Sequence, residues 1–265
     1  MSSYRHQFPI LVSVLLLTLP SFGLAENARP AALLTTGEIV QKLMAANLHR
    51  SQTLRSYQGK RTYYLNYSGL FGHHEAEMQV EVSYTAPDKK EFRVISRSGS
   101  SLLINRVLLK MLSSEAEAQE EKNRRQLEVN SDNYNFSLDQ MQHTPKGDFY
   151  VLSVTPKGKS RYLYRGKIWV DAHEFAVARM EGEPQKNPSI WVSHTEVGYG
   201  WLEQGGFWLP AHTESVSQVR MGGKITLTID YSDYQISSGT RLANEQEPAL
   251  QGTLPAPNAV VGDPH

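Results

Sequence analysis

The chain has no cysteine among its 265 residues, and this absence excludes several kinds of chemistry. Thiol catalysis, thiolate metal sites, disulfide scaffolds and lipid attachment through an N-terminal cysteine all require that residue. The chain also lacks net charge, with 27 Lys and Arg against 27 Asp and Glu, which argues against a nucleic-acid-binding protein or a polybasic membrane-binding protein. Aromatic residues make up 9% of the chain, which argues against disorder. A nearly neutral protein of one or two modest domains remains.

The apolar run near the N-terminus is shorter than the roughly 20 residues that a membrane-spanning helix needs. It covers Ile10 to Leu19, follows Arg5 and ends at Pro20. This pattern predicts a secretory signal peptide over residues 1–25, and an uncleaved membrane anchor is the alternative. Export combined with the absence of cysteine favours the bacterial periplasm or the cell exterior.

The C-terminal segment 237–265 contains four prolines and has neither a helical nor a strand period. We expect it to be a disordered tail. Residues 26–236 then have the size of a single β-rich domain.

An amphipathic helix is expected at about Thr36 to Ser51. Glu38 follows Thr35 by three residues, the spacing of a capping box that satisfies two free backbone amides. The following apolar residues recur at helical spacing: Ile39, Val40, Leu43, Met44 and Leu48.

Alternation of apolar and polar residues dominates the rest of the chain. Met78, Val80 and Val82 alternate with charged or polar residues, which is typical of an antiparallel strand with one face in water. Similar patterns predict strands at Tyr57–Tyr67, Ala76–Thr85, Glu91–Arg97, Tyr134–Gln140, Phe149–Thr155, Arg161–Val170, Phe175–Glu181, Ile190–Tyr199, Phe207–Val219 and Lys224–Gln235. Short turn sequences between them indicate a meander.

A second helix is expected from Ser101, where the alternation stops. Its apolar stripe consists of Leu103, Ile104, Val107, Leu108, Met111 and Leu112. The charged stretch Glu115 to Arg125 follows, and we expect it to be a solvated helix face.

A sheet of about ten strands has more apolar face than a flat arrangement can cover, so it is expected to curl with helices on its concave side. Two alternatives follow from this geometry. The space inside the curled sheet is either filled by side chains or left open for a ligand.

Two short motifs occur in the second half of the chain. Trp169-Val170-Asp171 ends one predicted strand, and Gly206-Phe207-Trp208-Leu209-Pro210 begins another. With the signal peptide, the N-terminal helix and the long meander, these motifs resemble the outer-membrane lipoprotein-sorting family. This is the LolA/LolB-like group, to which RseB-type periplasmic sensors are related. The resemblance spans about Ala31 to Ile236.

The resemblance implies a mainly β fold with α: a curved antiparallel sheet forming an unclosed half-barrel that is plugged by helices and encloses a hydrophobic cavity for acyl chains. The expected lid is the Leu103 to Leu112 stripe listed above. The expected cavity wall includes Val80, Val82, Ile168, Val192 and Leu227. Carriers of this family use a basic residue at the cavity entrance, and Lys60, Arg61 and Arg93 are the candidates here.

Other chemistry has weaker support in the sequence. His73-His74-Glu75 has the composition of a metal site, but neighbouring residues on a strand point to opposite faces, which favours a solvated hairpin. His173-Glu174 follows a strand directly and is typical of a tight turn. We therefore expect no metal, no cofactor and no catalytic residue.

Three functions remain in order of preference. The first is a non-enzymatic periplasmic carrier of lipoprotein or lipid acyl chains, acting as a monomer without nucleic acid. The second is a lipid-sensing regulatory module that binds a membrane-anchored protein partner. The third is an enzyme, which the lack of a converging nucleophile, base or metal set disfavours.

Overall fold

The computed structural model describes residues 34–118, 128–159, 163–187 and 192–239. The predicted signal peptide and most of the predicted tail lie outside these residues. Within them, no helix is both long enough and apolar enough to cross a membrane.

Helix α1 (Thr36–Thr53) begins at the predicted capping box. The Thr35 side chain accepts the Glu38 N–H, and the Glu38 carboxylate accepts the Thr35 N–H at 2.8 Å. The helix ends where Leu54 adopts an extended conformation and the first strand begins without a loop. Its buried face consists of Ile39, Val40 and Leu43.

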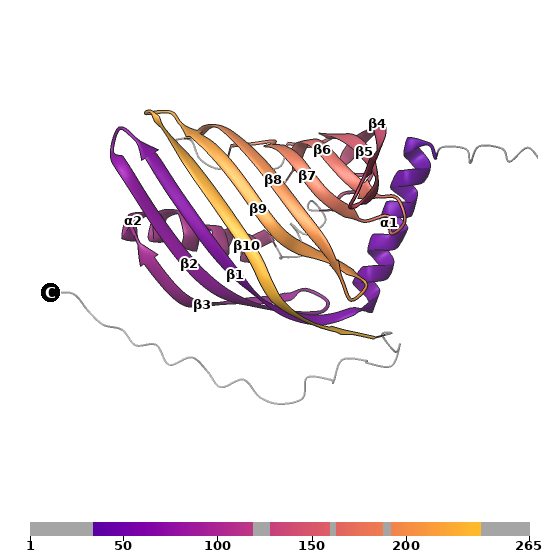
Figure 1. Ribbon diagram of the computed structural model, residues 1–265, viewed down its shortest axis with the longest axis horizontal. Coiled ribbons are helices and arrows are strands. Elements are labelled where there is room, and N and C mark those ends of the chain that lie inside the picture. The colour runs from indigo at the N-terminus through magenta and orange to yellow at the C-terminus, as the bar shows by residue number, and fades with distance from the viewer. Residues whose placement is uncertain (1–33, 119–127, 160–162, 188–191, 240–265) are drawn as a thin grey trace, which may run out of the picture. The chain divides into compact units, whose positions relative to one another are not determined.

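All ten predicted strands are present in the described part of the chain, and they form one antiparallel sheet (Figure 1). Their bounds are β1 Leu54–Gly69, β2 Gly72–Thr85, β3 Lys89–Gly99, β4 Tyr134–Thr144, β5 Gly147–Pro156, β6 Tyr164–Asp171, β7 Val177–Pro184, β8 Val192–Gln204, β9 Phe207–Val219 and β10 Gly223–Ser238. The spatial order is β3-β2-β1-β10-β9-β8-β7-β6-β5-β4, so β10 returns to pair with β1. The sheet is curved and unclosed, as predicted, with β3 and β4 as its edges.

Strand bounds differ from the predictions most at the end of β8, which was predicted at Tyr199 and lies at Gln204. The predicted first residues of β6 and β8, Arg161 and Ile190, lie outside the described residues.

The turn after β6 also differs. Phe175 was predicted to begin a strand, but it has a φ of 48° and lies in the tight turn before β7. Asp171 holds this turn because its Oδ1 accepts the backbone N–H groups of His173 and Glu174 at 2.9 and 2.8 Å. His173 and Glu174 are therefore turn residues, as their position in the sequence indicated.

The concave face of the sheet carries two separate hydrophobic clusters, each covered by a helix. The first cluster lies on β1, β2 and β10 beneath the second helical segment. The second cluster lies on β4, β5 and β6 beneath α1, and its fully buried members include Ile39, Leu43, Leu152, Ile168 and Val170. Both sets lie on the same side of the sheet, because cross-strand neighbours point to the same face. The pairings connect Ile229 of the first cluster through Thr213, Tyr199 and Met180 to Ile168 of the second.

Candidate functional site

The second helical segment runs without interruption from Ser101 to Ala118, and we call it the lid helix. It comprises α2 (Ser101–Leu103), the π-helical turn η1 (Ile104–Leu108) and α3 (Leu109–Ala118). The Ser100 side chain caps it by accepting the Leu103 N–H. In the π turn the Leu109 N–H donates to the Ile104 carbonyl, five residues earlier. Such turns are rare and recur at functional sites.

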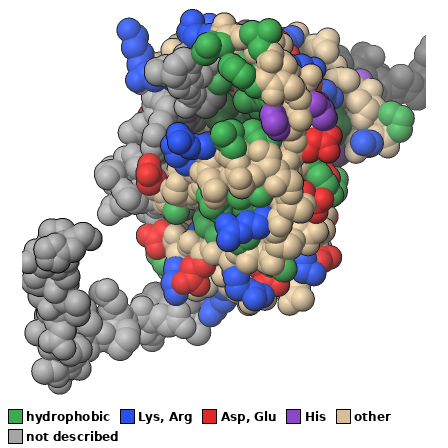
Figure 2. Space-filling view, turned by 90° about the vertical axis from the view of Figure 1, so that its left-hand side faces the viewer, with side chains coloured by type: hydrophobic (Ala, Val, Ile, Leu, Met, Phe, Trp, Pro, Cys, Tyr) green, Lys and Arg blue, Asp and Glu red, His purple; other side chains and the backbone are tan. Residues whose placement is uncertain are grey.

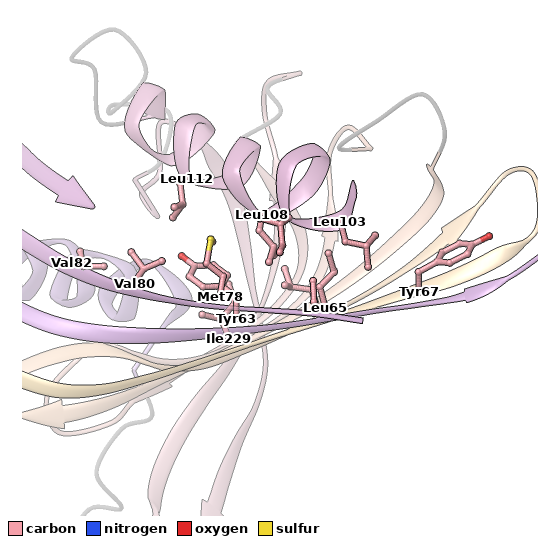
Figure 3. Close-up of a cluster of buried hydrophobic side chains, with 13 residues drawn as sticks. Tyr63, Leu65, Tyr67, Met78, Val80, Val82, Leu103, Leu108, Leu112 and Ile229 are labelled. Atoms are coloured by element: carbon pink, nitrogen blue, oxygen red, sulfur yellow. The ribbon is translucent and has the colours of Figure 1, made fainter. Parts of the chain in front are cut away.

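The lid helix packs on the sheet through the apolar stripe that the sequence predicted. Leu103, Ile104, Leu108 and Leu112 are buried, and Leu108 is 0% exposed. Figure 3 shows Leu103, Leu108 and Leu112 pointing from the helix toward the sheet. Facing them are Tyr63, Leu65 and Tyr67 of β1, Met78, Val80 and Val82 of β2, and Leu227 and Ile229 of β10. In this structure the lid helix therefore closes over the first cluster.

The predicted cavity residues do not all meet. Val80, Val82 and Leu227 join the lid residues in the first cluster, and Val107 and Met111 lie half-buried at its margin. Ile168 lies in the second cluster beneath α1. Val192 belongs to neither cluster, although it pairs with Val219, which packs against the first one.

A polar seam lies between the two clusters on β6, β8, β9 and β10, and the sequence analysis did not single it out. Tyr199 donates to the Tyr164 hydroxyl at 2.9 Å, and the buried hydroxyls of Thr195 and Ser217 are 2.9 Å apart. Burial raises the pKa of Tyr199 well above its ordinary value. The seam has a weak signal in the sequence, namely hydroxyl residues at inward positions of otherwise alternating strands.

The three basic candidates lie on opposite faces of the sheet. Lys60 pairs with Asp233 at 2.9 Å, and Arg93 pairs with Glu81. Both basic residues line a groove of about 750 Å³ whose other walls include charged and polar side chains. Arg61 points the other way, beneath the lid helix, where its side chain is only 7% exposed. Of the three candidates, Arg61 alone touches the lid helix in the described residues.

Arg61 is the centre of an ionic cluster that joins the lid helix to two strands. Its guanidinium donates to both oxygens of Glu115 on α3, at 2.6 and 3.1 Å. Lys90 of β3 donates to the same carboxylate at 2.6 Å. The Arg61 guanidinium also lies 5.0 Å from the ring centre of Tyr231 and 5.5 Å from that of Phe92. Arg61, Lys90 and Glu115 form what we call the ionic cluster.

The ionic cluster corrects one prediction. The charged stretch Glu115 to Arg125 was expected to be a solvated helix face, but the Glu115 carboxylate is folded back onto the sheet. Glu117 is exposed, as expected, and residues 119–125 of this stretch lie outside the described residues. A helical pattern shows which residues share a helix face, but it does not show which distant strand brings a guanidinium to that face. Lys90 was not singled out in the sequence, because no local feature distinguishes it from Lys89.

The protonation of the ionic cluster follows from burial and charge. Burial alone would raise the pKa of Glu115, but the positive charge of Lys90 and the hydrogen bond from Arg61 outweigh it and lower that pKa to about 2. The carboxylate in turn raises the pKa of Arg61 despite the opposing effect of burial. Burial also raises the pKa of Tyr63, whose hydroxyl accepts from Arg61, to about 12. Arg61 and Glu115 are therefore both charged at neutral pH.

The depressed pKa of Glu115 predicts a loss of stability in acid. The stabilisation is complete above the pKa of an unfolded glutamate, about 4.3, and is lost as the pH falls toward the folded value of about 2. We expect urea unfolding to show up to about 3 kcal/mol less stability at the acid end of this window. Glu115→Gln should remove this part of the pH dependence, and an unchanged profile in that variant would contradict the assignment.

The His73-His74-Glu75 segment lies at the start of β2, next to the hairpin turn. His73 Nε2 lies 2.8 Å from Glu75 Oε1, and His74 Nε2 lies 2.9 Å from the Phe71 carbonyl oxygen. The two imidazoles thus have different partners and do not converge. Among the described residues there is no cluster of three or more metal-binding side chains.

No protein-family model and no curated protein matches this chain. Similar solved structures include a DUF1329 family protein from Desulfovibrio piger, with a TM-score of 0.40 and 15% identity over 80% of this chain and 98% of its own. A putative outer membrane lipoprotein-sorting protein domain from Vibrio parahaemolyticus has a TM-score of 0.39 and 11% identity, covering 79% and 93%. The MucA/MucB complex of Pseudomonas aeruginosa gives a TM-score of 0.23 and 10% identity, covering 76% and 98%.

These structures are similar to most of this chain, at TM-scores of 0.40 or less. Their names include the lipoprotein-sorting family that the two sequence motifs resemble. At these TM-scores the likeness assigns no role to any residue of this chain.

Proposed function

We propose that the protein is a non-enzymatic periplasmic carrier that binds the acyl chains of a lipid or lipoprotein beneath the lid helix, for sorting to the outer membrane. The observation that supports this proposal is the lid helix itself. It covers an apolar concave face of an unclosed sheet, and its far end is held by the ionic cluster.

Hydrophobic energetics allow an acyl chain to take the place of the lid contacts. Burial of apolar surface is non-directional, so the sheet face gains as much from methylene groups as from Leu108 or Leu112. Each buried CH₂ contributes about 0.8 kcal/mol. A chain that occupies the sheet face therefore offsets the loss of lid contacts, and no polar anchor is required.

The two ends of the lid helix are attached differently. At its beginning, Gly99 has a φ of 87°, and the Ser100 N–H donates to the Glu75 carbonyl at 2.7 Å. A Cβ atom at Gly99 would lie 2.3 Å from the Glu75 oxygen, so glycine is required for this junction. At the other end, the attachment is the ionic cluster. Opening at Glu115 with the Gly99–Ser100 junction retained would expose the first cluster to a ligand.

A cross-linking experiment tests this proposal directly, because the chain has no cysteine of its own. Lys90→Cys combined with Glu115→Cys, joined by a cleavable bismaleimide, would tie α3 to β3. The protein is purified from a bacterial periplasm and delipidated, and a fluorescent fatty acid is titrated. We expect saturable binding before cross-linking, at least a tenfold loss after it, and recovery on cleavage.

A matched control uses the neighbouring pair on the other face of the sheet. Glu81 and Arg93 are direct cross-strand partners, so Glu81→Cys with Arg93→Cys forms the same kind of link without touching the lid helix. This link should leave probe binding unchanged. Equal binding by the locked and free lid would place the site elsewhere, and no binding by any form would mean that the space is filled.

A further inference from the structure

Two neighbouring hairpin tips at one end of the sheet expose large apolar side chains. Leu70 and Phe71 form the two-residue turn between β1 and β2 and are 80% and 66% exposed. Met221, in the turn between β9 and β10, is 55% exposed. Two-residue turns favour Asn, Asp and Gly, and a leucine or phenylalanine there contributes nothing to the protein core. We call Leu70, Phe71 and Met221 the apolar tips.

The two hairpins are held tightly together by glycine. Gly69 pairs with both Gly72 and Gly223, and a Cβ atom at Gly69 would lie 2.7 Å from the Gly223 Cα atom. Leu70 lies directly against Gly222, where an added Cβ atom would be 3.2 Å from the Leu70 Cδ1 atom. The apolar tips therefore form one surface that is contributed by two hairpins.

The base of the β1–β2 turn is braced by an aromatic contact. The ring of His74 stacks on the ring of Tyr67, with centroids 6.2 Å apart. The Nε2 atom of His74 lies 2.9 Å from the carbonyl oxygen of Phe71. This contact fixes the turn backbone while the side chains of Leu70 and Phe71 remain outside. The exposure is therefore a property of a supported turn.

Basic side chains flank the apolar tips. Arg220 and Lys224 stand on either side of Met221 in the same hairpin, and both are exposed. The nearby carboxylate of Glu75 is paired with His73. Figure 2 views the molecule from this end and shows hydrophobic side chains along its upper rim with Lys and Arg side chains beside them.

We propose that the apolar tips dock the protein on an anionic phospholipid surface. A phospholipid surface has an outer layer of anionic phosphates and an apolar layer of acyl chains beneath it. Large apolar side chains can enter the acyl layer, while neighbouring lysine and arginine side chains remain among the phosphates. Contiguous exposed apolar side chains rimmed by polar residues mark interaction sites. The inference does not depend on the proposed cargo, since none of these residues belongs to the first cluster's lid contacts.

Vesicle partitioning tests the proposal with protein purified from a bacterial periplasm. Vesicles of phosphatidylethanolamine with phosphatidylglycerol are compared with vesicles of phosphatidylcholine alone. We expect binding to the anionic vesicles that weakens as salt is added. For the double variant Leu70→Ser and Phe71→Ser, we expect the affinity for the anionic vesicles to fall by roughly tenfold or more. Arg220→Gln with Lys224→Gln should lose about fivefold per charge and most of the salt dependence.

The matched control is Leu202→Ser. Leu202 is 66% exposed, the same as Phe71, and lies in β8 beside the β8–β9 turn, at the opposite end of β9 from Met221. This variant should bind vesicles like the parent protein.

A depth-sensitive label gives a second readout, because the chain lacks cysteine. An environment-sensitive dye on Phe71→Cys should shift to the blue with anionic vesicles, whereas the same dye on Leu202→Cys should not. Equal partitioning of the parent and the Leu70/Phe71 variant would overturn the proposal. So would concentration-dependent dimerisation through the tips without vesicle binding. Fatty-acid uptake is measured in parallel, and it should be unchanged by all of these variants, so failure of docking and failure of cargo binding are separable.

Discussion

Leu108→Asp is expected to abolish fatty-acid binding while the β-sheet circular dichroism stays nearly the same. Leu108 is 0% exposed beneath the lid helix, and an aspartate there would place an unpaired charge against the apolar face of β1 and β2. The free energy that stabilises the lid helix on the sheet should fall by at least about 4 kcal/mol. If the lid helix can leave the sheet while the sheet stays folded, the substitution undocks the helix without unfolding the domain. The charged helix can then no longer cover an acyl chain.

Leu102→Asp is the control, since Leu102 lies in the same helix but is 66% exposed. It should leave both the dichroism and the binding unchanged. Cooperative unfolding of Leu108→Asp at room temperature would contradict the separable lid. It would show instead that the lid helix and the sheet form one core, as in the filled-core alternative that the sequence left open.

Glu115→Gln is expected to favour the open lid. The change leaves the Arg61 guanidinium, whose side chain is 7% exposed, without its carboxylate partner. Removing one partner of a buried ion pair costs about 3–5 kcal/mol, and the cost falls on the state in which the charge is buried. We expect faster hydrogen exchange in residues 101–118 and an apparent fatty-acid affinity that is roughly tenfold higher or more, because a larger fraction of the protein is competent to bind.

The matched control for this change is Glu81→Gln. Glu81 pairs with Arg93, whose side chain is 74% exposed, and such surface pairs contribute about 1 kcal/mol or less. It should alter neither exchange in the lid helix nor binding. A lower urea midpoint for Glu115→Gln with unchanged probe affinity would instead make the ionic cluster part of the general stability of the domain.

The two variants act in opposite directions on binding although both weaken the closed lid. Leu108 belongs to the apolar surface that an acyl chain would share, whereas Glu115 belongs to the attachment that keeps this surface closed. A protein in which the lid served only as core would respond to both changes with loss of stability alone. The comparison of the two therefore tests the carrier proposal more sharply than either variant does.

Local sequence patterns were sufficient for the elements of the fold. The capping box at Thr35 and Glu38 marked the start of α1, and period-two alternation located every strand of the sheet. Short turns between the strands predicted the meander, and an apolar stripe predicted the lid helix. These features depend on neighbours within a few residues, so they can be recognised in the sequence without knowledge of the tertiary structure.

Long-range pairing decided the site. The return of β10 to β1 puts Tyr231 beside Arg61, and the curvature of the sheet lets α3 bring Glu115 to the same guanidinium. It also assigned Ile168 to the cluster under α1, away from the other predicted wall residues.

The sequence by itself determined the elements, their order along the chain, the apolar face of β2 and the apolar stripe of the lid. Only the tertiary structure decided which basic residue meets the lid helix and which hairpin tips lie together. The physical reason is that alternation and helical period report the direction of a side chain relative to its own backbone. The distance between Arg61 and Glu115, 54 positions apart, depends on the register of several strands and on the bend of the sheet that they form.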